Sequence, residues 1–374
     1  MKRFQKFLRI VLGLLFGASL ALSVMPYVIA HYIDSSLLVF EAMIFLHMLV
    51  AYGVYTIILI IHEAGHLISG LMSGYSFVSY RIWSLTIIKL DGKLRVKRFK
   101  LTGTAGQCLM KPPLWTEKGI PVRFYNLGGI LLNLVCCLLT LPFCFLYPVT
   151  TFWGMIRLSF TVLSGMTFLL NGIPNQNNDG DNVFSLYKDP VAVRAFWSQM
   201  MGVALLAEGV ALKDIPEDLY DLPEGADLRN PLLAASAANW AQIPLYHHRF
   251  EEADEAISHV LEEASGMPPV LRFLLKNERV WFEVMHEDRK ETLDAFMDTE
   301  FQKFQKSMAS YPSVIRVLYT MALRNGEEEN AAKYRKAMDS LEKTYPYYEE
   351  VKEERFLMKM AEEHMAARSD RTAD

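Results

Sequence analysis

Two histidines and a glutamate stand at a spacing that suits metal-dependent hydrolysis. The sequence reads His62-Glu63-Ala64-Gly65-His66 inside a long apolar stretch. Residues four apart lie on one face of an α-helix, so His62 and His66 can present two imidazoles to the same ion. Glu63 would then lie beside a water on that ion and accept its proton. The pattern is typical of zinc hydrolases.

The setting of this motif strengthens the interpretation. An HExxH match arises by chance in roughly one chain in a hundred of this length, and a purely structural helix is the alternative. Ionisable residues within an apolar span are costly, at about 2.5 kcal/mol or more for a charge at the bilayer centre. Three such residues need partners, which favours a functional site.

A third metal ligand is expected later in the chain, because catalytic zinc usually has three protein ligands. The turn-forming stretch Asn171-Gly172-Ile173-Pro174 follows an apolar segment, and Asp179 and Asp181 come soon after it. Irregular backbone at membrane depth is tolerated where it faces protein or a water-filled cavity. The stretch would let a carboxylate reach the metal, although taken alone it would be an ordinary loop that ends a helix.

Apolar segments predict a membrane part with about four transmembrane helices. The chain is 52% hydrophobic, and its mean hydropathy is positive at +0.14. A bilayer span needs about 20 residues, and four segments reach that length: residues 7–30, 37–72, 124–146 and 152–170. The first exceeds the apolar core of a signal peptide, about 7–15 residues, so we interpret it as an uncleaved span.

The distribution of Lys and Arg predicts the orientation. The N-terminus is basic, the link before the second span contains neither residue, and the segment between the second and third spans is rich in both. By the positive-inside rule both termini should be cytoplasmic, with the His motif and Asp179 at the same depth near that face. The expected location is a bacterial cell membrane.

Two further regions have patterns of their own. Residues 77–101 alternate apolar and basic side chains around Asp91-Gly92, which predicts a β-hairpin on the cytoplasmic side. It is either a structural hairpin or one whose free edge binds an extended substrate strand. Residues 182–231 are expected to form a connecting helical segment.

Residues 232–374 are expected to form a cytoplasmic α-helical domain. Pro312 and Pro346 are 34 residues apart, the period of tetratricopeptide repeats, but an irregular helical bundle is equally compatible with the pattern. Residues 1–180 hold 15 Lys and Arg against 6 Asp and Glu, and the rest hold 23 against 36. These charges suit contact of the basic part with anionic lipid, leave the acidic part open to a protein partner, and argue against nucleic-acid binding.

Together the motifs resemble the site-2 protease family of intramembrane zinc metalloproteases. That family carries HExxH in one span and Asn-x-x-Pro-x-x-x-x-Asp-Gly at a later one, which here corresponds to Asn171, Pro174, Asp179 and Gly180. The segment from Gly128 to Asn133 resembles the family's Gly-x-x-x-Asn element. The resemblance covers roughly residues 37–181, which would form the protease core within residues 1–181.

The resemblance implies a ligand set and a reaction. His62, His66 and Asp179 would bind Zn²⁺, Glu63 would act as the general base, and Asn133 would lie at the active site and hydrogen-bond the scissile carbonyl. Asn133 is equally compatible with a polar contact between helices. Two features depart from the family pattern: Asn178 stands where Leu is usual, and Asp181 offers a second carboxylate.

The expected function is therefore hydrolysis of peptide bonds in membrane-embedded or membrane-associated substrates near the cytoplasmic face. One alternative is a zinc-dependent hydrolase or transporter that acts on something other than protein, which only the family motifs disfavour. The other is a non-proteolytic membrane scaffold that binds a partner through its cytoplasmic helical domain. The intact set of four residues argues against that alternative, since nothing else requires all of His62, Glu63, His66 and Asp179.

Overall fold

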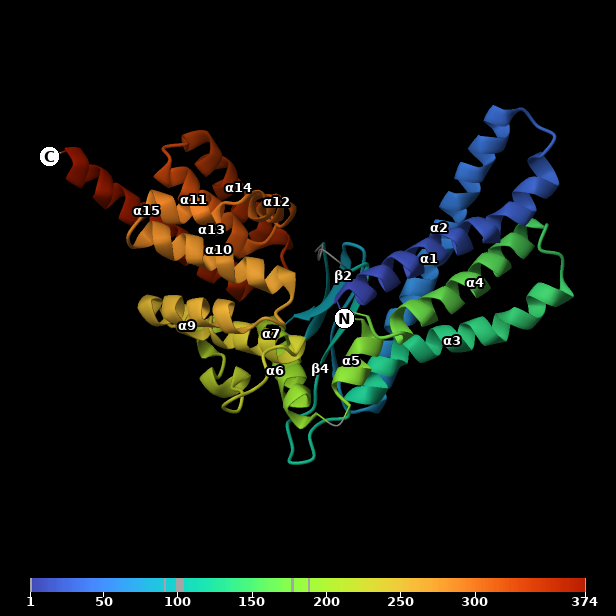
Figure 1. The fold of residues 1–374 in the computed structure, drawn as a ribbon, viewed down its shortest axis with the longest axis horizontal. Coiled ribbons are helices and arrows are strands. Elements are labelled where there is room, and N and C mark those ends of the chain that lie inside the picture. The colour runs from blue at the N-terminus through green and yellow to red at the C-terminus, as the bar shows by residue number, and fades with distance from the viewer. Residues whose placement is uncertain (1, 91, 99–103, 176–177, 188, 374) are drawn as a thin grey trace. The chain divides into compact units, whose positions relative to one another are not determined.

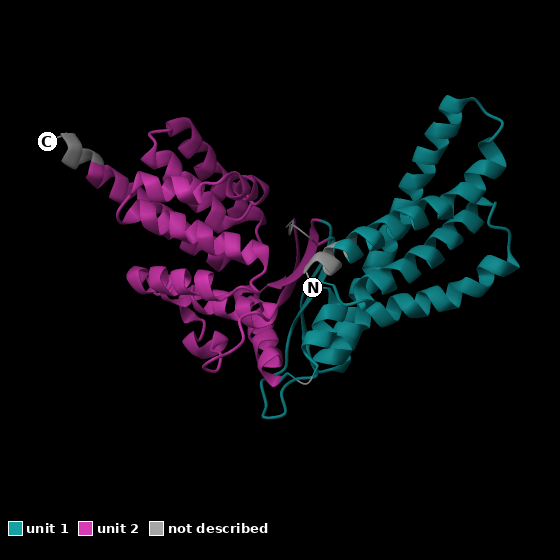
Figure 2. Cartoon of the chain, viewed as in Figure 1, with its two compact units in different colours: residues 1–83, 105–189 teal, residues 84–104, 190–374 magenta. Residues whose placement is uncertain are grey.

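The chain is described by a computed structural model that covers residues 2–373 except 91, 99–103, 176–177 and 188 (Figure 1). It forms two compact units (Figure 2). Unit 1 contains residues 1–83 and 105–189, and unit 2 contains residues 84–104 and 190–374.

Unit 1 is built mainly from long apolar helices: α1 (Lys2–Tyr32), α2 (Leu37–Met72), α3 (Val122–Leu146), α4 (Phe152–Gly172) and the short α5 (Asp179–Ser185). Thr151 caps α4 by accepting a hydrogen bond from the Gly154 N–H at 3.0 Å. Many large apolar side chains on these helices are exposed, including Leu38, Leu139 and Trp153. Such surfaces suit a lipid environment better than water.

Five described helices are long and apolar enough to cross a membrane, one more than the four predicted spans. Four of them are α1 to α4. The fifth is α6 (Pro190–Ala207), which belongs to unit 2. Of the most apolar 18-residue segment of α6, 56% is buried within the protein, against 17–39% of the corresponding segments of the other four helices. It packs on α7 (Pro231–Trp240), where Ser198 and Ser236 share a buried hydrogen bond of 3.1 Å.

The predicted hairpin is one part of a larger antiparallel sheet. The strands β1 (Ser76–Ile82), β2 (Leu85–Leu90), β3 (Lys93–Arg98) and β4 (Gly106–Lys111) have the order β3-β2-β1-β4. The β2–β3 hairpin confirms the predicted turn at Gly92, whereas Asp91 and residues 99–101 lie outside the described residues. The prediction missed β1 as a separate strand and β4 altogether, and the unit boundary falls between β1 and β2.

Unit 2 is otherwise helical. Its remaining helices, in addition to the 3₁₀ turns Leu212–Asp214 and Glu217–Tyr220, are α8 (Ile243–Tyr246), α9 (Phe250–Glu263), α10 (Pro269–Met285), α11 (Lys290–Phe296), α12 (Thr299–Ser307), α13 (Pro312–Arg324), α14 (Glu328–Thr344) and α15 (Tyr348–Ala373). The fully buried Arg316 pairs with Glu278 and Glu354 and ties α13 to α10 and α15. The tetratricopeptide-like repeat remains a prediction.

Glycines bring α2 and α3 into backbone contact beside the His motif. A Cβ atom on Gly65 would lie 2.3 Å from the Gly128 carbonyl oxygen, and one on Gly129 would lie 2.6 Å from His62 Cε1. Next to this contact, the Ser69 hydroxyl donates to the Gly65 carbonyl at 2.8 Å. Small residues are what allow two membrane helices to approach this closely.

This contact gives a first prediction. Replacing Gly65 by Ala should separate α2 from α3 and destabilise the folded chain by about 1–3 kcal/mol, the usual cost of overpacking. Unfolding of the purified chain in detergent, followed by circular dichroism, measures the effect. Gly53→Ala in the same helix is the control, because its Cβ would meet nothing within 4 Å. Equal stability of the two variants would contradict the close contact.

Candidate metal centre

Three side chains from distant parts of the sequence meet in unit 1. His62 Nε2 lies 3.0 Å from Asp179 Oδ2, His66 Nε2 lies 3.3 Å from the same oxygen, and the two Nε2 atoms are 3.3 Å apart. Both histidines are buried, at 5% and 6% exposure. Among the described residues this is the one group of His, Cys, Asp or Glu side chains whose ligand atoms gather closely enough to hold a metal ion.

The triangle of ligand atoms fits a tetrahedral zinc ion. Zinc bonds to His N and carboxylate O of about 2.0–2.2 Å place tetrahedral ligand atoms about 3.3–3.5 Å apart. The observed separations of 3.0–3.3 Å are close to that range. With three protein ligands, a fourth position would remain for water or substrate, which is the arrangement of catalytic zinc sites.

The backbone of α3 orients the His66 ring. His66 Nδ1 donates its hydrogen to the Tyr125 carbonyl oxygen at 2.9 Å. With the proton on Nδ1, the Nε2 lone pair is free to face the metal position. Metal-binding histidines almost always have such an outer partner.

Asn133 holds the corresponding position behind His62. Its amide is fully buried, and its Nδ2 lies 3.0 Å from His62 Nδ1, while its Oδ1 has no hydrogen-bond partner. A 180° turn of the amide would let His62 Nδ1–H donate to Oδ1 and satisfy both groups. Asn133 therefore lies behind the His62 ring, on the side away from Nε2, where it can orient the imidazole.

The loop before α5 fixes the position of Asp179. The Asn178 Oδ1 atom accepts from the backbone N–H groups of Asn175 at 3.1 Å and Asp181 at 2.9 Å. Its Nδ2 donates to the carbonyls of Leu170 and Ile173, both at 2.7 Å. One side chain thus joins the end of α4 to the start of α5, a role that the usual Leu could not perform.

The same loop distinguishes the two candidate carboxylates. Asp179, and not Asp181, belongs to the group of ligand atoms. The ionised form of a carboxylate is the one that binds metal.

Glu63 is buried beside this group, on the same helical turn. Its carboxylate accepts a hydrogen bond from the backbone N–H of Cys108 in β4. A Cβ atom on Gly106 would lie 2.4 Å from Glu63 Oε1, so a side chain at position 106 would displace the Glu63 carboxylate. The Tyr125 hydroxyl donates to the Cys108 carbonyl at 2.8 Å. The edge of β4 that faces away from β1 therefore faces Glu63.

Comparisons with known proteins add no identification. No protein-family model, curated protein or solved structure matches the chain. The resemblance to site-2 proteases consequently depends on the sequence motifs alone.

The structure brings together all five residues that the sequence suggested for the site. His62, His66 and Asp179 form the ligand triangle, Glu63 lies beside it, and Asn133 lies behind His62. Sequence reasoning did not identify Tyr125, Gly106, Cys108 or the linking role of Asn178. The first three act through backbone groups or through a missing Cβ, and such roles leave little trace in residue type.

The second prediction concerns the third ligand. Asp179→Asn should weaken zinc binding by more than the roughly 10–100-fold that loss of an outer partner costs, because a ligand oxygen is lost from the metal itself. Asp181→Asn should retain the metal. Chelator competition on the purified full chain, followed by metal analysis, measures both, and the opposite ranking would reassign the ligand.

The third prediction tests how Asn133 acts. Asn133→Ala should weaken zinc binding roughly 10–100-fold, whereas Asn133→Asp, which still accepts from His62 Nδ1–H, should largely restore it. Asn126→Ala is the matched control in the same helix, since the Asn126 amide bonds Val122 and Asn182 and touches neither histidine. Normal zinc affinity in Asn133→Ala would rule out the orienting role.

Proposed function

We propose that the chain is an intramembrane zinc metalloprotease that cleaves membrane-embedded or membrane-associated proteins or peptides near the cytoplasmic face. One observation carries the proposal: three ligand atoms lie 3.0–3.3 Å apart beside a buried glutamate. A structural metal site would have four closed ligands and no need of Glu63. The intact set also disfavours a non-proteolytic scaffold.

The proposed membrane part is α1 to α4. These helices expose most of their apolar surface, as lipid-facing helices do, whereas α6 buries more than half of its most apolar segment inside unit 2. We therefore assign α6 to the cytoplasmic part, which keeps four spans and puts both termini on the cytoplasmic side. At about 1.5 Å per residue, α2 is about 54 Å long, so it extends past a hydrocarbon core of about 30 Å. The His motif lies in the second half of α2, near its C-terminal end, which the proposed topology puts on the cytoplasmic side.

The proposed reaction is peptide hydrolysis in which Glu63 moves the proton. A zinc ion held by His62, His66 and Asp179 would supply Lewis acidity, activating a water and polarising the scissile carbonyl. Glu63 takes the proton from the attacking water and passes it to the leaving amine. The Cys108 N–H keeps the carboxylate aimed while it is unprotonated. The Tyr125 carbonyl holds the His66 imidazole in the tautomer that binds metal. Asn133, with its amide turned so that Oδ1 faces His62 Nδ1, would do the same for His62.

A strand edge is the proposed means of holding an extended substrate. A helical substrate must unwind before its peptide bond is accessible, and a strand edge can satisfy the backbone groups that this frees. The sequence suggested the free edge of residues 77–101 for this role. In β4 the outward backbone groups of Cys108 already bond Glu63 and the Tyr125 hydroxyl, so the free edge within residues 77–101 stays the predicted substrate edge. The helices of unit 2 remain available for a cytoplasmic protein partner.

The fourth prediction tests catalysis directly. Glu63→Gln should keep the metal ligands but reduce cleavage by about 10²–10⁴-fold, since the proton acceptor is lost. Membrane-protein fragments from cells with the native chain are compared with fragments from cells with the variant. Glu41→Gln, at an exposed position of the same helix, is the control and should behave as the native chain does. Identical fragment profiles for all three chains would refute proteolysis.

A further inference from the structure

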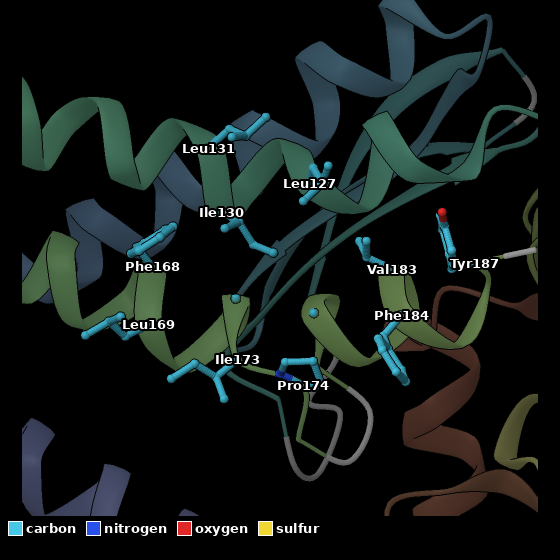
Figure 3. Close-up of a pocket in the computed structure, with 12 residues that line it drawn as sticks. Leu127, Ile130, Leu131, Phe168, Leu169, Ile173, Pro174, Val183, Phe184 and Tyr187 are labelled. Atoms are coloured by element: carbon cyan, nitrogen blue, oxygen red, sulfur yellow. The ribbon is translucent and has the colours of Figure 1, made fainter.

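A cavity lies in unit 1 beside the end of α4 and the start of α5 (Figure 3). It is enclosed by the cytoplasmic-side ends of α3 and α4 and by α5, and its volume of about 490 Å³ is within the range of roughly 300–1,000 Å³ usual for ligand sites. Its lining is almost wholly apolar. Leu127, Phe168 and Val183 point into it from the three helices.

The cavity is separate from the metal centre. Leu127 and Leu131 project from the side of α3 opposite to Gly129, which contacts the histidine rings. A peptide bond bound in the cavity would therefore have α3 between it and Glu63. Because its scissile bond could not reach the site, a substrate segment is a poor candidate for the occupant.

The rim of the cavity carries a positive charge. Arg123, Leu127 and Leu131 are spaced four residues apart and so lie along one face of α3, with Arg123 at its first turn. The Arg123 guanidinium lies 4.4 Å from the ring centroid of Tyr187, which lines the cavity. Arg123 is exposed and makes no ion pair with the described residues of the chain. An apolar hollow with a cation at its mouth is complementary to an anionic amphiphile.

We propose that this cavity binds an anionic phospholipid, with an acyl chain between α3, α4 and α5 and the phosphate on Arg123. Leu131 and Leu169 are each 40% exposed at the opening, so the proposed bilayer can supply the chain directly. The proposal rests on the membrane placement proposed above and not on proteolysis.

A ligand in the cavity would contact residues close to Asp179 in the sequence. Gly172, Pro174 and Gly180 form part of the cavity wall, and a Cβ on Gly180 would lie 2.4 Å from the Gly172 carbonyl oxygen. The loop that presents Asp179 is thus packed tightly on one side and borders the lipid site on the other. A bound acyl chain would support that loop.

The fifth prediction is measured by lipid retention. The full chain is reconstituted in nanodiscs containing equal amounts of phosphatidylcholine and phosphatidylglycerol, and the lipid that stays bound after release is counted by native mass spectrometry. We expect the native chain to retain phosphatidylglycerol in preference. Arg123→Gln should reduce the ratio of retained phosphatidylglycerol to retained phosphatidylcholine roughly fivefold, which is the effect of one basic residue at a membrane surface. Lys118→Gln, an exposed cation in the loop before α3, is the matched control.

Filling the cavity tests the acyl site. Val183→Trp should abolish retention of the lipid. Leu127→Phe is a second filling variant with the same expected result, for use if Val183→Trp does not fold. Leu138→Trp, on an exposed part of α3, is the control and should retain the lipid. Equal retention of both lipids, or retention by a filled variant, overturns the proposal. Loss of cleavage with lipid retention unchanged would assign the cavity to substrate instead. Recovery of the chain without detergent would contradict the membrane placement itself.

Discussion

The close backbone contact of α2 and α3 at Gly65 and Gly128 is the constraint on which the site depends. It brings the face of α3 within hydrogen-bonding distance of both histidines, so that the Tyr125 carbonyl and the Asn133 amide each meet one ring. A methyl group at the contact would move these partners away by more than the tolerance of a hydrogen bond. The positions of the three ligand atoms therefore depend on the glycines at the contact, which have no side chains.

Several buried polar residues around the ligand triangle of unit 1 offset one another's burial. An ionisable group that is buried without a partner is strongly unfavourable. Here the histidines meet Asp179 and α3, Glu63 meets the Cys108 N–H, and Asn178 uses both ends of its amide. Removing one member would leave its neighbours unpaired, which makes the network rigid as well as polar.

The sequence predicts the parts of this structure that depend on residue type and period. Hydropathy gave the long helices of unit 1, and the i, i+4 spacing gave His62 and His66. The turn at Gly92 gave the β2–β3 hairpin. The sequence does not predict β4, because Gly106–Lys111 is a short strand without clear alternation of apolar and polar residues. Its role at the site comes from backbone N–H groups. Hydropathy alone also could not predict how much of α6 is buried, since packing against α7 is a tertiary property.

The order of the ligands along the chain has a consequence for biosynthesis. The two histidines emerge from the ribosome more than a hundred residues before Asp179, and α3 follows them with the groups that orient both rings. The two histidines and Glu63 are therefore synthesised before Asp179, the carboxylate that lies against both rings. The centre is completed only when α4 has been made and Asn178 has folded the segment behind it. Until then the growing chain holds both histidines and Glu63, but not the complete group of side chains proposed to bind the metal.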